Sequence, residues 1–580
     1  MPRFLQVFYA VFSGTLIALA IPNELFNSGS PLAGIISLVP LYIAFSRSKS
    51  YKEAFWLCWI HGAVTHLLSS FWLGNFQGFA IFTLGASDIG TGFLEAFVSL
   101  IMFYPFALSS GTLSQKRFFI PLRVFWFSGI YAVYEWCKSV GFLAYPWGTL
   151  SMTACKWRFI TQIADITGTY GITILFALFS AVIGETFCSF TRGKKTSSEK
   201  RNLSDCADCA KAVFALAAVS VAYGIYQCAV PRIPVKTLNA ILVQQNMDPW
   251  EGGDAQSIEI SKQITKEKAA EFKALSVQPD LVVWSEGILS KKFPAAQSYY
   301  EHFPESEPLM KFIKDTKIPF VIGGSVTINS EEHKNGNAAI LIDKNGKFKG
   351  SYIKLHLVPF AESIPGSQYA FVRAIVKKIA GFSYGWTQGS KYVLFEIPLN
   401  TKTPPSGTQI ISLLPQNAQT NPQTALISVP ICFDDAFGEV CRGLFLNGSE
   451  VFVNITNDAW SETRSAEYQH FAVASYRAIE YRTTLVRCTN SGYTVITDPA
   501  GKILQDLPLF VQAGLAAKIP VYRSRMTTYA LLGNWLPVSI MILAAAFIIL
   551  QTHTQRKHKP PRPPTEPADD CQTKADEFSD

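Results

Sequence analysis

Apolar residues are concentrated in blocks near the two ends of the chain. Seven apolar stretches follow one another up to about residue 228, and one more stands alone near the C-terminus. Each has about the 17–25 mostly apolar residues that a helix needs to cross a bilayer, although the second is short. The pattern therefore predicts eight membrane spans, at Phe4–Ile21, Pro31–Phe45, Ala54–Phe71, Gly92–Leu108, Phe119–Val140, Tyr170–Phe190, Cys209–Cys228 and Tyr529–Leu550. The first stretch lacks a clear small-x-small cleavage site, so we interpret it as a span and not as a signal peptide.

The middle of the chain, from about Val235, has a different pattern in which short apolar runs alternate with polar, helix-compatible segments. The apolar runs have the length of strands, and Asp343-Lys-Asn-Gly346 between two of them is a strong hairpin signal. Alternating strands and helices predict a layered α/β domain. We place it at residues 235–520, between a seven-span membrane domain at residues 1–230 and the last span at residues 529–550.

Two segments differ in composition from their surroundings. Asn400–Pro422 is rich in Pro, Thr, Gln and Asn, which predicts a long surface loop inserted into the α/β domain. Residues 553–580 are Pro-rich and charged, which predicts a disordered tail.

Composition supports a membrane protein with a separate soluble part. Of 580 residues, 49% are hydrophobic and 13% aromatic, and only 16% are charged. Soluble domains have about 25% charged residues. A soluble protein of this length would not be so poor in charge, and the length alone predicts more than one domain.

Lys and Arg are concentrated in every second loop between the predicted spans, which predicts the orientation of the chain. The alternate loops Pro22–Ser30 and Gly74–Gly90 contain neither residue. Both termini are therefore expected in the cytoplasm, and the α/β domain outside the inner membrane. The formal charge of +8 follows largely from this bias, and no basic stripe with interleaved aromatics predicts a nucleic-acid partner. The basic loop residues are Arg47, Lys49, Lys52, Lys116, Arg117, Arg123, Arg192, Lys194, Lys195, Lys200, Arg201, Arg556, Lys557 and Lys559.

The 11 cysteines form no regular framework, so the chain is not a disulfide scaffold. Cys206 and Cys209 have CxxC spacing but no second pair, and zinc or redox chemistry there is the weaker interpretation. No metal or cofactor is expected, since the histidines show no ligand spacing. The histidines of the α/β domain are His302, His333, His356 and His470.

Three reactive side chains lie at the ends of predicted strands. Glu286 follows Leu281-Val-Val-Trp284, Lys354 follows the hairpin, and Cys432 ends the apolar run that begins at Ala425. A thiol needs a base, which a buried carboxylate can be, and a lysine can stabilise the oxyanion of a tetrahedral intermediate. Taken singly, each has an ordinary explanation: a helix cap, a surface charge and a buried structural thiol.

The order of these residues and their neighbours resembles the nitrilase (carbon–nitrogen hydrolase) superfamily, and in particular its membrane branch, the apolipoprotein N-acyltransferases. The resemblance covers essentially the whole chain to about residue 550. The motifs that carry it are Val283-Trp-Ser-Glu286, Tyr352-Ile-Lys-Leu-His-Leu-Val-Pro-Phe-Ala-Glu362, Ile431-Cys432, Ile455-Thr-Asn-Asp-Ala-Trp460, Gln469-His470, Arg477-Ala-Ile-Glu480 and Gly533-Asn-Trp535.

The resemblance implies an αββα sandwich with Cys432 as nucleophile, Glu286 as general base and Lys354 as the oxyanion-stabilising group. It implies that Glu362 orients the site or the lysine. Residues that shape the pocket or its lids would be Asn337, Trp250 and Trp460, with Asp434 as a further supporting residue.

The chain departs from the family pattern beside the nucleophile. Cys-Tyr-Glu is common in the family, whereas this chain has Cys432-Phe433-Asp434, and Ser461-Glu462 replaces Phe-Gly after Trp460. We expect these changes to affect acceptor contacts and lid shape, and not the core chemistry.

The resemblance implies a two-step acyl transfer in the bacterial inner membrane. A phospholipid acylates Cys432 as a thioester, and the chain then passes to the α-amino group of a diacylglyceryl-cysteine at a lipoprotein's N-terminus. Two alternatives stay open: a membrane-anchored amidase that hydrolyses a small amide, and a transporter or receptor whose exported domain only binds a ligand.

Overall fold

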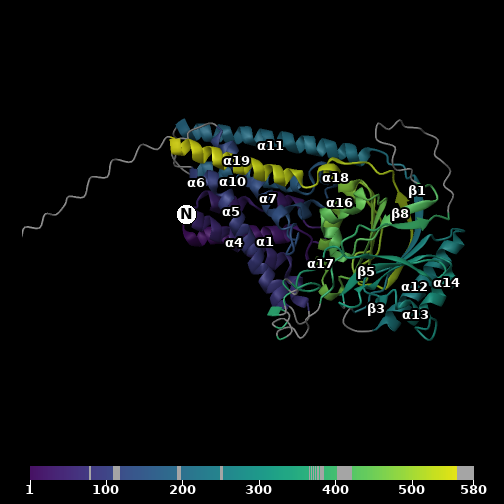
Figure 1. Cartoon of the computed structure of the whole chain (residues 1–580). Helices are drawn as coiled ribbons and strands as arrows, with labels where there is room; N and C mark the ends of the chain where they lie inside the picture. Colours follow the sequence, from purple (N-terminus) through teal and green to yellow (C-terminus); the bar gives the residue numbers. More distant parts are fainter. Residues whose placement is uncertain are drawn as a thin grey trace, which may run out of the picture.

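The molecule has a helical part and an α/β part that lie end to end (Figure 1). The computed structural model describes residues 1–76, 80–108, 118–191, 197–248, 253–332, 334–364, 366, 369, 371–372, 374, 378, 385–400 and 421–557. Trp250, His333, parts of the basic loops at residues 109–117 and 192–196, most of the predicted surface loop (401–420) and most of the predicted tail (558–580) lie outside these ranges.

Most of the predicted spans of the N-terminal half form helices. Serine residues cap the N-termini of two of these helices. The Ser30 side chain accepts a hydrogen bond from the N–H of Ala33, and the Ser50 side chain accepts one from the N–H of Glu53. The helices of this part are α1 (Arg3–Ala20), α2 (Pro31–Ile36), α3 (Val39–Ser46), α4 (Tyr51–Ser69), α5 (Ser87–Met102), α6 (Tyr104–Ala107), α7 (Phe119–Cys137), α8 (Arg158–Thr161), α9 (Ala164–Thr167), α10 (Tyr170–Thr191) and α11 (Ser197–Ala229), with single turns η1 (Phe71–Asn75), η2 (Ile81–Ala86) and η5 (Leu150–Ala154).

Among the described residues, five helices are long and apolar enough to cross a membrane by length and composition. Their large apolar side chains are exposed, for example Phe4 at 74%, Val219 at 68% and Leu543 at 68%. Such surfaces are stable only against lipid or another protein, so they indicate an integral membrane protein. The five are Arg3–Ala20, Thr83–Met102, Tyr170–Thr191, Leu203–Ala229 and Trp535–Thr554.

The structure differs from three of the eight predicted spans. The fourth, Gly92–Leu108, is divided at Phe103 into α5 and α6. The second is two short helices, α2 and α3, because Pro40 at the start of α3 has no N–H to continue the preceding helix. The last is also divided. Gly533, with a φ of 59°, ends α18 (Thr528–Leu532), and α19 (Trp535–Lys557) begins after it. The long C-terminal helix therefore begins at Trp535 and not at Tyr529.

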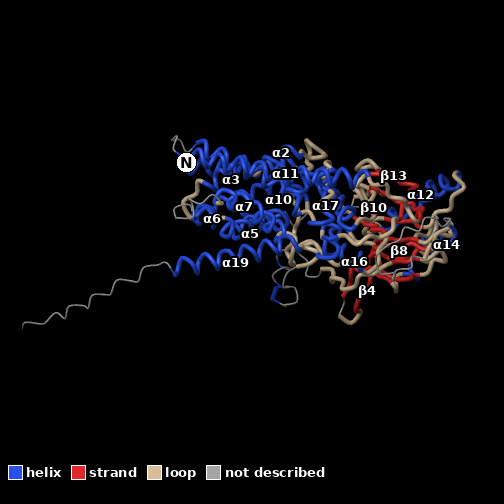
Figure 2. Tube along the Cα trace, turned by 90° about the horizontal axis from the view of Figure 1, so that it is seen from above, coloured by secondary structure: helices blue, strands red, loops and turns tan. Residues whose placement is uncertain are grey.

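The α/β part contains two sheets, shown in red in Figure 2 at the end of the molecule away from the N-terminus. One has the strand order β13-β1-β2-β4-β5-β6, with β3 on β4, and the other β12-β11-β10-β9-β8-β7. The strands are β1 (Lys236–Gln244), β2 (Leu281–Trp284), β3 (Leu289–Phe293), β4 (Phe320–Asn329), β5 (Lys334–Ile342), β6 (Phe348–Ile353), β7 (Phe395–Pro398), β8 (Thr424–Ser428), β9 (Val451–Thr456), β10 (Thr484–Thr489), β11 (Val495–Thr497), β12 (Ile503–Asp506) and β13 (Ala513–Val521).

The sheets pack face to face, because alternate residues of their strands are apolar on both faces. In β1, Leu238 and Leu242 belong to the core shared with the second sheet, whereas Ile241 and Val243 pack with the helices outside. The layers are helix, sheet, sheet, helix, so the predicted layered α/β domain is confirmed. The outer helices are α12 (Asp254–Ala274), α13 (Gln297–Tyr300) and α14 (Leu309–Thr316) on one side and α16 (Gly438–Leu446) and α17 (Arg464–Tyr481) on the other.

Helix α17 joins the two parts of the molecule. One hydrophobic core runs from the N-terminal helices into the second sheet. Gln469 of α17 donates to the carbonyl oxygens of Pro22 (2.8 Å) and Ser69 (3.0 Å), and it accepts from the indole of Trp72 (3.3 Å). The α/β part is therefore built onto the helical part and not tethered to it by linkers alone.

Arg482, directly after α17, is expected to stabilise this junction. Its buried guanidinium contacts Asp165 (2.6 Å) and Gln162 (2.5 Å). Arg482→Met leaves the Asp165 carboxylate buried without its cation, so the free energy of unfolding should fall by about 3 kcal/mol. Thermal unfolding in detergent measures the change, and Arg523→Met, at an exposed arginine, is the control. Equal melting temperatures for the two variants would contradict the prediction.

Candidate active site

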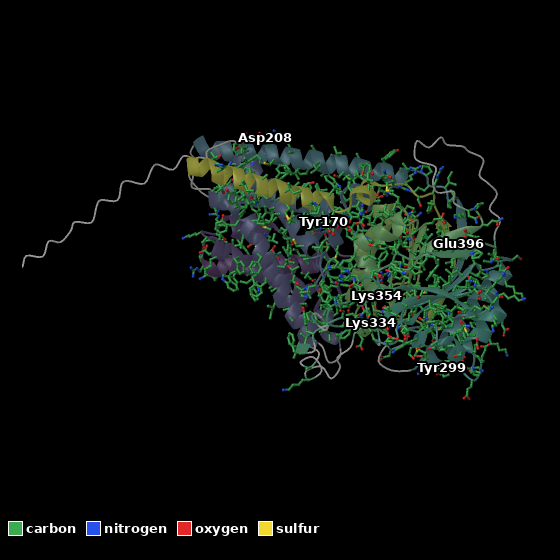
Figure 3. The ribbon with its side chains drawn as sticks, in the orientation of Figure 1. Tyr170, Asp208, Tyr299, Lys334, Lys354 and Glu396 are labelled. Carbon is green, nitrogen blue, oxygen red and sulfur yellow. The ribbon has the colours of Figure 1, made fainter. Side chains whose placement is uncertain are left out.

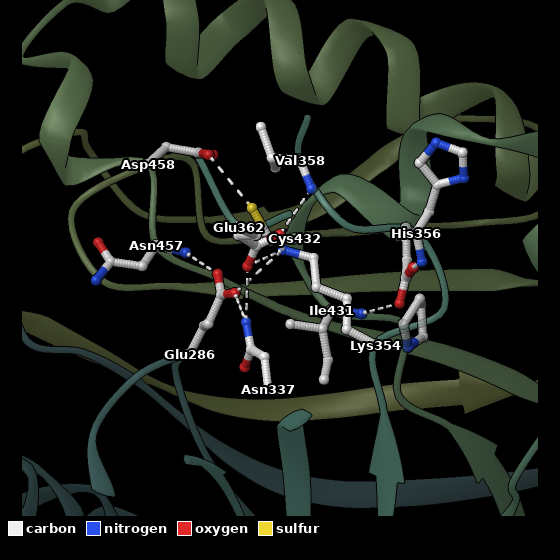
Figure 4. Close-up of polar contacts among 12 residues, drawn as sticks. Glu286, Asn337, Lys354, His356, Val358, Glu362, Ile431, Cys432, Asn457 and Asp458 are labelled. Carbon is white, nitrogen blue, oxygen red and sulfur yellow. Dashed lines mark hydrogen bonds and ion pairs between the residues drawn. The ribbon is translucent and has the colours of Figure 1, made fainter. Parts of the chain in front are cut away.

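The three predicted catalytic residues lie together where the two sheets meet. Glu286 follows β2, Lys354 follows β6 and Cys432 follows β8 by four residues. Because β2 and β6 belong to one sheet and β8 to the other, the packing of the sheets brings these strand ends together. Figure 3 places Lys354 on the side of the α/β part that is nearer to the helical part, and Figure 4 shows the three side chains converging.

Lys354 is the centre of a buried hydrogen-bonded cluster. Its Nζ is 3.4 Å from Oε1 of Glu286 and 2.8 Å from Oε2 of Glu362. Asn337 donates to both carboxylates, at 2.6 Å to Glu286 and 3.0 Å to Glu362. The backbone N–H of Asn457 donates to the other oxygen of Glu286 (3.0 Å). The cluster fixes the positions of both carboxylates and the ammonium before any substrate binds (Figure 4).

Glu362 is held by the loop that carries Lys354. Its Oε2 accepts from the N–H of Val358 (2.9 Å), and its Oε1 lies 2.9 Å from the Lys354 ammonium. The contact supports the expected role of Glu362 in orienting the lysine, and Asn337 joins Glu362 to Glu286.

The backbone at Cys432 is strained. Its φ is 46°, in the left-handed region that non-glycine residues rarely adopt. Asn454, on β9, donates to the carbonyl oxygens of Pro430 and Cys432, each at 3.2 Å, and so holds the turn. The strained turn points the thiol away from its own strand and toward Glu286 and Lys354 (Figure 4).

The electrostatics of the cluster keep the resting thiol protonated. Burial raises the pKa of the Cys432 thiol well above its usual range, the carboxylate of Glu286 raises it further, and Lys354 lowers it. Burial also raises the pKa of Glu286, against the effect of Lys354. Burial alone would lower the pKa of Lys354, but Glu286 and Glu362 outweigh it and raise the pKa. At rest the site therefore holds a protonated thiol beside the carboxylate of Glu286 and the ammonium of Lys354.

The two departures from the family pattern beside Cys432 have separate structural roles. The Asp434 carboxylate accepts from the Tyr352 hydroxyl (2.8 Å) and from the N–H groups of His356 (2.7 Å) and Ile431 (3.1 Å). It joins the Lys354 loop to the Cys432 turn. Burial raises the pKa of Asp434 to about 7, although Lys354 and these hydrogen bonds oppose the change.

Phe433 packs the turn of Cys432 against the helical part. Its ring stacks on Trp147 with centroids 5.5 Å apart and on Tyr145 at 6.5 Å. Both lie in the loop after α7. Trp460 makes a second contact of this kind, with Trp72 at 5.6 Å and an edge-on approach to Phe76 at 5.1 Å. Aromatic side chains of the helical part therefore lie against the turn of Cys432 and the loop after β9.

A second buried charged network adjoins the thiol. Oδ1 of Asp458 lies 3.8 Å from Sγ of Cys432. Its Oδ2 contacts His470 Nδ1 (2.7 Å), while His470 Nε2 contacts Asp435 (2.9 Å), which also bonds Arg487. Sequence reasoning assigned no role to these residues. Asp458 follows β9 as Glu286 follows β2, so a search for reactive side chains at strand ends could have found it. The other members of the network come from separate segments of the chain, and no local pattern points to them.

The donors of Cys432, Asp458 and His470 lie within 4.8 Å of one another, a spacing that a metal ion would accept. The residues do not fit one, because both ring nitrogens of His470 already face carboxylates. Burial lowers the pKa of His470, but the adjacent Asp458 and Asp435 outweigh it and raise the pKa to about 9. The imidazole is therefore a cation and has no lone pair to offer.

The protonation of His470 predicts a dependence of stability on pH. A folded-state pKa of about 9, above the unfolded value, means that the stabilisation is complete below about pH 6.5 and is lost as the pH rises through 9. The free energy of unfolding should fall by about 3 kcal/mol over this window. Melting temperatures in detergent at pH 6.5, 7.5 and 9 measure it. His470→Gln should flatten the dependence, and an unchanged slope in that variant would contradict the assignment.

Comparison with known proteins gives consistent results along the chain. Residues 241–527 match the carbon-nitrogen hydrolase family, and residues 13–182 match the apolipoprotein N-acyltransferase N-terminal domain. Apolipoprotein N-acyltransferase 2 of Treponema denticola is 37% identical over 95% of this chain and 98% of its own length. Apolipoprotein N-acyltransferase 2 of Treponema pallidum is 35% identical over 94% and 95%, and the apolipoprotein N-acyltransferase of Borreliella burgdorferi 29% over 93% and 94%.

Two solved structures resemble about half of the chain. A carbon-nitrogen hydrolase from Helicobacter pylori is 15% identical, with a TM-score of 0.33, over 49% of this chain and 89% of its own. An amidase from Nesterenkonia is 17% identical, with a TM-score of 0.32, over 50% and 94%.

Proposed function

Because the chain belongs to the apolipoprotein N-acyltransferase family, we propose that it moves an acyl chain from a membrane phospholipid to the α-amino group of a lipoprotein's N-terminal diacylglyceryl-cysteine, through a thioester on Cys432. The observation that carries the proposal is the position of the Cys432 turn. The thiol lies beside the Glu286–Lys354–Glu362 cluster, and the next residue, Phe433, stacks on the helical part.

The first half-reaction forms the thioester. Glu286 takes the proton of the Cys432 thiol as the sulfur attacks the ester carbonyl of the phospholipid. The Lys354 ammonium stabilises the oxyanion of the tetrahedral intermediate, since a buried, preformed cation acts strongly on developing charge. The C–O bond breaks, and Glu286 returns its proton to the leaving lysophospholipid.

The second half-reaction moves the chain to nitrogen. The carboxylate of Glu286 takes a proton from the acceptor's amino group, and the amine attacks the thioester carbonyl beside Lys354. The C–S bond then breaks, the amide leaves and the sulfur regains a proton. One base and one cation therefore serve both half-reactions, because the covalent intermediate separates the two substrates in time.

The helical part supports access for two lipids. The turn of Cys432 lies against Tyr145 and Trp147, and Trp460 lies against Trp72. Aromatic side chains beside apolar helices favour acyl chains that enter from the bilayer. Trp460 and Asn337 would then shape the pocket, as the resemblance implies for Trp250 as well.

The membrane arrangement is part of the proposal. Eight spans with both termini in the cytoplasm place residues 235–520 on the outer side of the bacterial inner membrane. The alternation of Lys and Arg between loops supports this orientation. Cysteine labelling with a membrane-impermeant reagent, at single sites in the loops, tests it.

The function is tested by following each half-reaction. The purified protein is incubated with a phospholipid that carries a labelled acyl chain, and mass spectrometry is used to find the thioester on Cys432. A diacylated peptide with a free α-amino group is then added, and the label should appear on the peptide as an amide. Release of free fatty acid without peptide acylation would instead support a hydrolase, and no label on Cys432 would contradict both.

A further inference from the structure

Asp458 approaches the reactive sulfur from a different side than the catalytic base and lysine. Figure 4 shows Asp458 on one side of the Cys432 sulfur and Glu286 and Lys354 on the other. Its Oδ1 lies 3.8 Å from Sγ, and among the described residues the thiol is the donor that reaches this oxygen. The side chain is buried, with about 8% of its surface exposed. The two half-reactions described above assign no role to it.

The surrounding residues keep Asp458 charged. Burial raises the pKa of Asp458, but the cations of His470 and Arg487 outweigh it and hold the pKa below its usual range. Oδ2 lies 2.7 Å from His470 Nδ1 and 3.6 Å from an Arg487 nitrogen. Asp435 contacts both of these cations in turn, so two carboxylates and two cations form a balanced set. The network is built to present an anion beside the sulfur.

This anion opposes the first half-reaction. A carboxylate beside a thiol raises the pKa of the thiol, and Asp458 does so for Cys432. A residue whose only task was to activate the thiol would carry the opposite charge. The charge of Asp458 is therefore of use at another point of the cycle.

Acylation changes what the Asp458 oxygen faces. The thiol has one hydrogen, and a thioester sulfur has none, so Oδ1 loses its donor when Cys432 is acylated. A buried anionic oxygen without a hydrogen-bond donor is strongly unfavourable. The acyl-enzyme therefore favours a cationic donor at a position next to the carbonyl carbon that the sulfur carries.

We propose that Asp458 binds the α-ammonium group of the acceptor in the acyl-enzyme and holds its nitrogen beside the thioester carbonyl. The proposal rests on the proposed function. An ammonium group has three N–H donors, so it can bond Asp458 with one and give a second proton to Glu286. A water molecule has no charge for Asp458 to attract, which favours aminolysis over hydrolysis.

The proton balance of this step closes. The bound ammonium gives one proton to Glu286, and the nitrogen lone pair attacks the thioester carbon while a remaining N–H still bonds Asp458. When the C–S bond breaks, the thiolate takes a proton from Glu286. The amide nitrogen keeps one hydrogen, and the third proton leaves to solvent. Asp458 gains and loses no proton, and it regains the thiol as its donor.

Asp458→Asn separates this role from the others, since asparagine has the same shape without the charge. We expect thioester formation from phospholipid to stay within about tenfold of wild type, because Glu286 and Lys354 are unchanged. Transfer from the thioester to a diacylated peptide should fall by about 100-fold, as expected for the loss of a charge-assisted hydrogen bond. Cleavage of the same thioester by hydroxylamine, which is uncharged at neutral pH, should change little. Asp315→Asn, at an exposed aspartate of α14, is the control.

Three outcomes would overturn the proposal. Equal loss of rate with the peptide and with hydroxylamine would mean that Asp458 acts on the thioester and not on the acceptor. An unchanged rate with both would mean that Asp458 has no role in the reaction. Failure of the variant to form a thioester would mean that Asp458 acts on the Cys432 thiol in the first half-reaction. If the wild-type protein forms no thioester, the proposed function fails first, and the inference fails with it.

A second measurement needs no variant. Two analogues of the diacylated peptide are compared as inhibitors of transfer by the wild-type protein. One has a dimethylated α-amino group, which keeps the positive charge and one N–H, and the other lacks the amino group. We expect the charged analogue to inhibit at about tenfold lower concentration. Equal inhibition by the two would contradict an anionic binding group for the acceptor.

Discussion

Cys432→Ala should form no thioester with phospholipid, and lipoprotein N-acylation should fall by at least about 10⁴-fold. The reason is chemical, since alanine leaves Glu286 and Lys354 in place but removes the atom that carries the acyl chain. Cys432→Ser should also be inactive in transfer, because a buried hydroxyl beside two carboxylates is much harder to deprotonate than a thiol. Maturation of a diacylated reporter lipoprotein in membranes measures the loss.

The control for this variant is Cys441→Ala. Cys441 is buried in α16, nine residues further along the chain, and is a free thiol. It should support near-normal transfer with a small loss of stability. A Cys432→Ala protein that still matured lipoproteins would remove Cys432 from the mechanism, whatever the effect on the control.

Lys354→Ala should lower both half-reactions by about 10³-fold, because one cation serves two tetrahedral intermediates. The change also leaves the carboxylates of Glu286 and Glu362 beside the vacated site, both of them bonded to Asn337. Two adjacent carboxylates without a cation favour protonation of one of them, and a protonated Glu286 no longer acts as a base. Single-turnover acylation and deacylation rates measure the two losses separately.

Lys344→Ala, at an exposed lysine of the β5–β6 hairpin, is the matched control and should have the wild-type rate. A near-normal rate for Lys354→Ala would exclude the oxyanion role. Loss of only the first half-reaction would mean that another group stabilises the second intermediate.

The sequence predicted the elements whose patterns are local. Helix α17, Arg464–Tyr481, is one of the helix-compatible segments between the strands, and its length and its Thr463 cap are both local features. Glu286 and Cys432 each follow an apolar run and Lys354 follows the hairpin, but their roles were predicted from the resemblance of the motifs around them. Strand β3 was missed, since Leu289-Ser-Lys-Lys-Phe293 has apolar residues only at its ends and three exposed residues between them.

Contacts between distant segments were beyond the sequence pattern. Asp435, His470 and Arg487 come from a turn, a helix and a strand, and no spacing rule relates them. The contact of Phe433 with Trp147 joins the α/β part to the helical part across almost half of the chain. Such contacts depend on how whole layers of the fold pack together. A residue with no distinctive local pattern can therefore be recognised as part of the site only in the folded molecule.

The pairing of the first and last strands of the α/β part has a consequence for modularity. Strand β1 runs antiparallel to β13 from Lys236 opposite Val521 to Gln244 opposite Ala513. The chain therefore enters and leaves this part at neighbouring points, as in a domain inserted into a host protein. If residues 236–521 are exchanged between relatives, the two junctions in the chain lie close together in space. Chimeras built in this way can test which relative's helical part accepts which α/β part. The contacts of α17 with the helical part are the interface that must be compatible.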